Sequence, residues 1–140
     1  MKKLILIMLI AVVMVACGKK EVKQASPESK LTQEAFTLTE TIRAAFVKRD
    51  TDTLRKNSTE EGFSAITANT RTYDSVDLIF TPRWADIDGD KVSLNVSWKS
   101  EWKVSGSFVS DRGMTVFLLA GKPLKVVKIL QANPFILSGK

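Results

Sequence analysis

The sequence has no histidine and only one cysteine, Cys17, in 140 residues. Histidine is the side chain most often used as a general base near neutral pH, and it is the commonest metal ligand. Its absence removes the usual apparatus of metalloenzymes and of hydrolases that use a serine, histidine and aspartate triad. A single cysteine leaves no second thiol for a disulfide within the chain. We therefore predict no catalytic residues, no metal site and no cofactor, and a fold that depends on its apolar core.

The sequence also lacks any concentrated stretch of one charge. It carries 21 Lys and Arg residues against 15 Asp and Glu residues, a formal net charge of +6. Most of the basic residues stand singly among polar and acidic neighbours, whereas a nucleic-acid binder gathers them into a stripe or patch. We therefore expect no nucleic-acid partner. The densest basic group, Lys19, Lys20 and Lys23, comes directly after Cys17, where it would face lipid headgroups.

Long hydrophobic runs are missing as well. The longest uninterrupted run, Leu4 to Ala16, has 13 residues, whereas a helix needs about 20 to cross the hydrocarbon core of a bilayer. Two lysines precede the run and small residues follow it, which is the order typical of a secretory signal peptide. We predict a cleaved signal peptide over residues 1–16 and an exported mature chain.

The end of this run, Met14-Val15-Ala16-Cys17-Gly18, resembles the lipobox of bacterial lipoproteins. The resemblance implies a diacylglycerol on the sulfur of Cys17, cleavage before it, and a further chain such as palmitate on its freed amine. Two or more acyl chains hold a protein stably on a bilayer. We expect a lipid anchor on the non-cytoplasmic side of the cell envelope. Gly18 in place of aspartate favours the outer membrane, facing the periplasm, if the source has two membranes. The alternative is an ordinary secretory signal with an incidental cysteine.

Helical patterns occupy the first half of the exported chain. Ser26-Pro27-Glu28 combines a hydroxyl cap, a proline at the first helical position and an acidic first turn, which is typical of a helix start. Apolar residues then recur every three or four positions, which predicts one amphipathic helix to about Arg49. Asp50 or Thr51 can cap a second, short helix. The capping-box pattern Ser58-Thr59-Glu60-Glu61 opens a third.

After Tyr73 the apolar residues alternate with polar ones, which is typical of strands with one face in water. Pro82 cannot donate a ladder hydrogen bond, so we expect a bulge or bend at this position. A turn is predicted at Asp111-Arg112-Gly113, and the segment Gly106 to Ser110 either extends the second strand or begins the third. The predicted strands lie at about 76–88, 92–104, 114–120 and 124–131.

Helices followed by an antiparallel meander predict an α+β fold. Three segments in this order, IRAAFVKRDTDTL, ADIDGDKVSLNVSW and GMTVFLLAGKPLKVVKILQANPF, resemble the nuclear transport factor 2-like (cystatin-like) superfamily, and particularly its small bacterial lipoproteins. The resemblance implies a long N-terminal helix and short helices packed on a curved sheet of about four strands, shaped as a cone that often has a pocket. We assign this domain to residues 30–137, after a lipidated cysteine and polar linker over residues 17–29.

The tryptophans are the candidate ligand-binding residues. Trp84, Trp98 and Trp102 could line a pocket for an apolar ligand, because such pockets are usually lined by aromatic side chains. Strand alternation places Trp84 with Phe80, and Trp98 with Trp102, on the faces of the buried aliphatic residues. Packing of an apolar core explains the same pattern.

Three functions fit these observations. We expect a non-catalytic lipoprotein that is anchored through Cys17 and binds a small apolar ligand or another envelope protein. The first alternative is a small cone-fold isomerase, dehydratase or hydrolase that uses carboxylates. The second is an assembly protein that forms a homodimer through an exposed sheet face, which the family resemblance implies.

Overall fold

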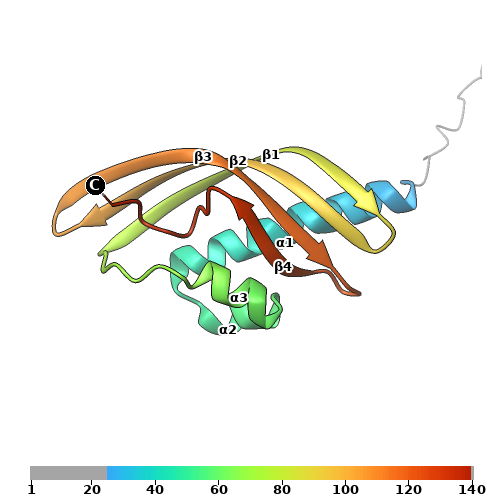
Figure 1. Cartoon of the computed structure of the whole chain (residues 1–140), viewed down its shortest axis with the longest axis horizontal. Helices are drawn as coiled ribbons and strands as arrows, with labels where there is room; N and C mark the ends of the chain where they lie inside the picture. The colour runs from blue at the N-terminus through green and yellow to red at the C-terminus, as the bar shows by residue number, and fades with distance from the viewer. Residues whose placement is uncertain (1–24, 140) are drawn as a thin grey trace, which may run out of the picture.

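A computed structural model of the chain describes residues 25–139, in which three helices precede four strands (Figure 1). The α+β fold class predicted from the sequence is confirmed, because the helices lie against a four-stranded antiparallel sheet. The predicted signal peptide and Cys17 lie outside the described residues. The elements are α1 (Pro27–Lys48), α2 (Thr51–Lys56), α3 (Glu60–Ile66), β1 (Ser75–Asp88), β2 (Lys91–Val104), β3 (Ser107–Ala120) and β4 (Lys125–Gln131).

The long helix α1 begins and ends where the sequence predicts. The Ser26 hydroxyl accepts a hydrogen bond from the Ser29 backbone N–H at 3.1 Å, and Pro27 stands in the first turn. Arg49 takes a left-handed conformation with φ 58° and ends the helix. None of the helices within residues 25–139 has the length and hydrophobicity that crossing a membrane requires.

The cap of α3 differs from the prediction by one residue. Thr59, rather than Ser58, accepts the hydrogen bond from the Gly62 N–H, at 3.2 Å. The cause is tertiary, because Ser58 forms an isolated bridge with Val126 of β4 and the Thr59 N–H donates to the Val126 carbonyl at 2.9 Å. This bridge holds Ser58 beside the sheet, so the helix begins one residue later.

The strands form a simple meander in the order β1-β2-β3-β4. The turn between β2 and β3 falls at Ser105 and Gly106, which both have positive φ, so the segment from Ser107 begins the third strand. The predicted turn at Asp111-Arg112-Gly113 is therefore wrong. Gly113 pairs with Trp98 of β2, and a Cβ at Gly113 would lie 2.9 Å from the Trp98 ring. Gly113 therefore leaves space for the Trp98 ring and does not form a turn.

The predicted irregularity at Pro82 is confirmed as a bulge in β1. Pro82 pairs with Val96, and the next paired residue, Trp84, faces Asn95, so Arg83 is an extra residue. Since successive side chains of a strand point to opposite faces, one extra residue reverses every position after it. The placement of Trp84 with the buried aliphatic residues is therefore wrong: Trp84 is 55% exposed, on the opposite face.

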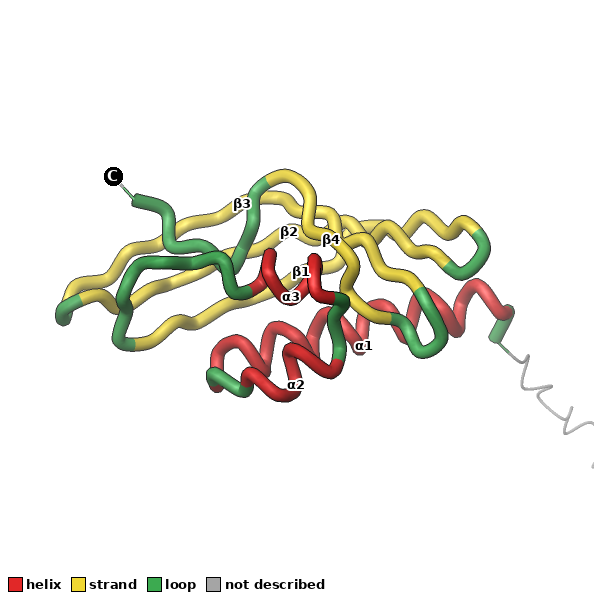
Figure 2. Tube along the Cα trace, turned by 60° about the horizontal axis from the view of Figure 1, so that its bottom comes forward, coloured by secondary structure: helices red, strands yellow, loops and turns green. Residues whose placement is uncertain are grey.

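The sheet has an inner face covered by helices and an outer face that no described helix covers (Figures 1 and 2). Helix α1 contacts β1 and β2, and α3 contacts β4. Arg43 of α1 donates to the Leu78 carbonyl of β1 at 2.9 Å, which ties the helix to the sheet. The hydrophobic core lies between the two layers and is one cluster that runs from Ala35 to Leu137.

The substitution Gly62→Ala tests how closely α3 packs against β4. A Cβ at this position would lie 2.0 Å from the Val126 carbonyl oxygen, so Gly62→Ala should force the helix and strand apart. Overpacking of this kind costs about 1–3 kcal/mol of the free energy of unfolding, which urea denaturation measures. Ser64→Ala, at an exposed position of the same helix, should change it by less than about 0.5 kcal/mol. Equal stabilities for the two variants would contradict this packing.

Candidate functional site

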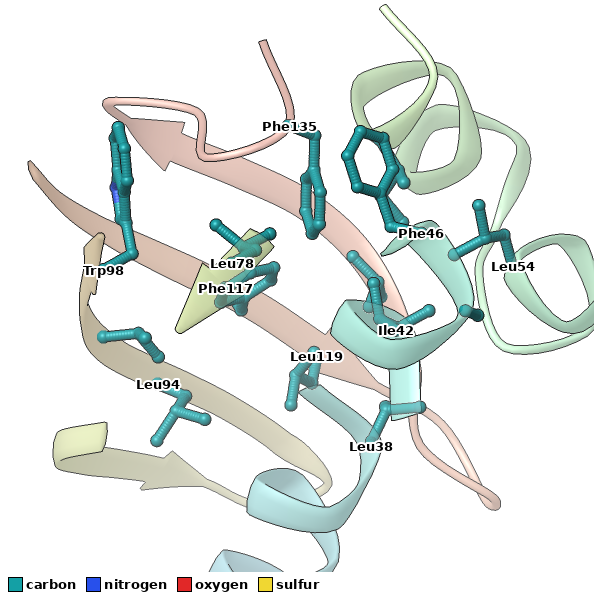
Figure 3. Close-up of a cluster of buried hydrophobic side chains, with 14 of the residues drawn as sticks. Leu38, Ile42, Phe46, Leu54, Leu78, Leu94, Trp98, Phe117, Leu119 and Phe135 are labelled. Atoms are coloured by element: carbon teal, nitrogen blue, oxygen red, sulfur yellow. The ribbon is translucent and has the colours of Figure 1, made fainter. Parts of the chain in front are cut away.

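The inner face of the sheet, where a cone fold can hold a pocket, is filled by an aromatic cluster around Phe135. The Phe135 side chain is fully buried. Its ring centroid lies 4.8 Å from that of Phe46, 5.9 Å from that of Phe80 and 6.2 Å from that of Phe117. Figure 3 shows the Phe135 ring directed into the core beside Phe46 and above Ile42. A side chain of the protein therefore occupies the centre of this face.

Hydrogen bonds hold the C-terminal segment in this position. The Asn133 side-chain amide donates to the Ala65 carbonyl at 2.8 Å, and its Oδ1 accepts from the Phe135 N–H at 3.0 Å. Asn69 accepts from the Leu137 N–H at 3.3 Å, and Arg71 donates to the Ser138 carbonyl at 3.0 Å. The segment after β4 is thus connected on both sides of Phe135, to α3 through Asn133 and to the loop that follows α3 through Leu137 and Ser138.

The structure separates Trp84 from Trp98 and Trp102, the other two tryptophans that the sequence suggested as ligand-binding residues. Trp102 is fully buried and donates from Nε1 to the Ser100 hydroxyl at 3.1 Å. Trp98 is 4% exposed and donates to the Ala132 carbonyl at 3.2 Å. Trp84 stands on the outer face. Ligand binding by these residues stays a prediction, and they do not share one pocket wall.

No Asp or Glu side chain is fully buried among residues 25–139. The buried polar side chains of the described residues are uncharged: Thr39, Ser58, Asn95, Ser100 and Thr115. Asp111 is half-buried and pairs with Ser100 across the sheet. Its Oδ2 accepts a hydrogen bond from the Ser138 hydroxyl, and its Oδ1 accepts from the Arg112 N–H at 2.8 Å. Between residues 25 and 139 no three Asp, Glu, His or Cys side chains are grouped as a metal site would require.

The outer face is the second candidate site, because it exposes large apolar side chains in one region. The bulge at Pro82 brings Trp84 to this face, in one cross-strand row with Asn95, Val116 and Leu130. Trp84 is 55% exposed, Met114 40% and Leu130 37%. A contiguous exposed apolar patch on a sheet marks an interaction site more often than scattered apolar residues do.

Asn95 in the middle of this patch is a site residue that sequence reasoning missed. It is 7% exposed, and its Oδ1 is buried without a hydrogen-bond donor in the part of the chain that the structure describes. An unsatisfied buried acceptor costs about 1–3 kcal/mol. In the sequence Asn95 looks like any polar residue on the wet face of a strand. Its burial depends on the neighbouring strands, which the sequence alone does not align.

Comparison with known proteins supports the fold alone. No protein-family model matches the chain, and no curated protein matches it by sequence. A solved structure described as a nuclear transport factor 2 (NTF2-like) superfamily protein from Salmonella enterica serovar Typhimurium is similar, with a TM-score of 0.65. The match covers 76% of this chain and 93% of that one at 14% sequence identity. The domain therefore has the NTF2-like fold that the sequence resemblance implied.

Phe135→Ala tests whether this residue completes the core. Removing a fully buried phenylalanine ring leaves a cavity, and such changes cost about 3–5 kcal/mol. We expect a loss of that size in the free energy of unfolding, measured by urea denaturation. Ile136→Ala is the matched control, because Ile136 is its neighbour and is 39% exposed; it should lose no more than about 1 kcal/mol. A Phe135→Ala variant as stable as the control would show that the inner face is not filled in solution.

Proposed function

We propose that this protein is a lipid-anchored, non-catalytic binding protein of the bacterial cell envelope, and that it acts by contact with another protein. The anchor is Cys17, and the binding unit is the NTF2-like domain. The observation that carries this proposal is the burial of Phe135 among Phe46, Phe80 and Phe117. It leaves the outer face of the sheet as the larger surface for recognition.

The sequence of the leader supports the anchor. A 13-residue apolar run after two lysines, ending in Val15-Ala16-Cys17, has the order of a lipoprotein signal. Fully extended, the ten residues from Cys17 to Ser26 reach at most about 35 Å, so the domain stays close to the bilayer. The N-terminus of α1 lies at the same end of the domain as the turn between β1 and β2 (Figure 1). The hairpin of β2 and β3 is at the opposite end and would point away from the lipid.

The filled inner face supports a protein partner over a small apolar ligand. A ligand pocket usually buries most of its ligand in a concave, partly preformed cavity. Here the aromatic side chains that would line such a cavity contact one another, and Trp98 and Trp102 use their N–H groups within the protein. A protein partner needs only a flat, partly apolar surface, which the outer face offers.

The carboxylate enzyme considered from the sequence receives less support. Such an enzyme would hold an Asp or Glu inside the cone, where burial raises its pKa. Asp111 is half-buried and pairs with the buried Ser100, and it is already hydrogen-bonded to Ser138 and to its neighbour Arg112. This contact satisfies the carboxylate within the fold.

Cys17→Ser tests the anchor. Without the thiol no diacylglycerol is attached, so the full-length protein should lose its lipid label and its processing at residue 17. In cells of a lipoprotein-producing bacterium fed a labelled fatty acid, we expect label on the wild type and none on the variant. The mature wild-type protein should fractionate with membranes and resist extraction with high salt.

A matched control separates loss of a thiol from loss of the signal. Cys17→Ser combined with Gln24→Cys keeps one cysteine in the chain but moves it away from the small residues of the leader. It should remain unlabelled. Mass spectrometry of the wild type that finds an intact Met1 and a free Cys17 thiol would overturn the anchor.

A further inference from the structure

We infer that a groove on the outer face of the sheet binds a free peptide of two or three residues, and that it holds the peptide's ammonium and carboxylate at two separate pairs of charged side chains. The groove has a volume of about 600 Å³ and is lined by residues of β1, β2 and β3, on the face that no described helix covers (Figure 1). Sites for small ligands have volumes of about 300–1,000 Å³. This site is additional to the proposed protein contact, and the inference does not depend on the lipid anchor.

The groove contains two pairs of like charges. In the acidic pair, Asp77 of β1 lies directly opposite Glu101 of β2. In the basic pair, Lys99 of β2 lies directly opposite Arg112 of β3. All four side chains are exposed. Because like charges directly opposite each other destabilise a sheet, a cation at the acidic pair and an anion at the basic pair would remove both repulsions.

The four side chains form no ion pair within residues 25–139. The ion pairs of this part of the chain are Arg43–Glu40, Arg55–Glu60 and Lys128–Glu61. Arg43 acts electrostatically on Asp77. Its guanidinium, however, already donates hydrogen bonds to Glu40 and to the Leu78 carbonyl. Asp111 also lines the groove, and its carboxylate accepts hydrogen bonds within the chain. The acidic and basic pairs are therefore available to a ligand.

The spacing of the two pairs sets the length of the ligand. Lys99 and Glu101 are two residues apart on β2, about 6.6 Å along the strand, and the pairs are displaced by one strand, about 4.8 Å. Their centres are thus about 8 Å apart. An extended peptide spans about 3.5 Å per residue, so two or three residues separate the terminal charges by about 7–10 Å. Lys103, the next charged residue of β2 on this face, does not line the groove.

The residues around the basic pair suit the C-terminal residue of a peptide. The guanidinium of Arg112 can donate two parallel hydrogen bonds to a carboxylate, and Lys99 adds a point charge beside it. Ile79 lies opposite Lys99 on β1 and is 56% exposed. It offers an apolar contact to the last side chain of the ligand. We therefore expect a preference for an apolar C-terminal residue such as leucine.

The ethanolamine headgroup of a lipid is another zwitterion with an ammonium and an anionic group. Its ammonium and phosphate are joined through only two carbon atoms, which is shorter than the gap between the acidic and the basic pair. A single amino acid spans about 3.5 Å and is also too short to reach both pairs. The spacing therefore favours a free peptide over both.

The ligand is tested by titrating alanyl-leucine and alanyl-alanyl-leucine into the full-length protein in a non-ionic detergent, followed by its amide NMR signals. We expect at least one peptide to bind with a dissociation constant of about 1 mM, with the largest shifts at Lys99, Glu101 and Arg112. Leucine, glycerophosphoethanolamine and a peptide blocked at both ends should bind at least about tenfold more weakly. No binding of either peptide up to about 20 mM, equal binding of the blocked peptide, or tighter binding of glycerophosphoethanolamine would overturn the inference.

Arg112→Gln and Glu101→Gln test the two pairs with the peptide that binds more tightly. Arg112→Gln should weaken its binding about tenfold and leave binding of its C-terminal amide unchanged, because the amide already lacks the carboxylate. Glu101→Gln should have the matching effect, with the N-acetylated peptide unchanged. Both positions are exposed, so circular dichroism should show the melting temperature of the wild type.

Lys56→Gln, at an exposed position of α2, is the control and should leave binding of every peptide unchanged. If Arg112→Gln weakened the peptide and its amide equally, the carboxylate would not lie at the basic pair and the inference would be wrong. None of these measurements depends on a lipid at Cys17, so their outcome is independent of the anchoring experiment.

Discussion

The burial of Phe135 against Phe46, Phe80 and Phe117 is the contact on which the rest of the structure depends. It joins α1, β1, β3 and the C-terminal segment in one cluster. A chain without disulfides has to obtain its stability from burial of apolar area, and a curved sheet with one helix across it leaves a hollow. The C-terminal segment fills that hollow with an aromatic ring and is held there through Asn133.

The filled interior decides which surface is free for recognition. In a cone fold the inner face and the outer face both offer apolar side chains, but here the inner ones are matched by neighbours in the same chain. The outer face is not matched in this way: Trp84 is exposed, and the Oδ1 of Asn95 has no donor among residues 25–139. A single bulge at Pro82 causes this difference, since it turns Trp84 from the inner face to the outer one. Local backbone geometry thus shapes the surface that the protein offers to a partner.

Much of the fold could be predicted from the sequence. The cap at Ser26, the long amphipathic helix, and the alternation in the second strand and in the first strand up to Pro82 depend on residues close in the chain, and they formed as predicted. The failures involve distant residues. Gly113 looks like a turn residue, but it is placed under the Trp98 ring, and Ser58 loses the helix cap to Thr59 because it pairs with Val126 of β4. Trp98 and Val126 are too distant in the chain from Gly113 and Ser58 for a local sequence pattern to predict these contacts.

The sequence by itself determined the order and type of the elements. These properties follow from composition and periodicity over short windows. Only the tertiary structure decided that Trp84 is exposed on the outer face and that Phe135 fills the cone. Side-chain placement on a sheet depends on register and bulges, and these are set by the packing of strands and helices that are distant in the chain.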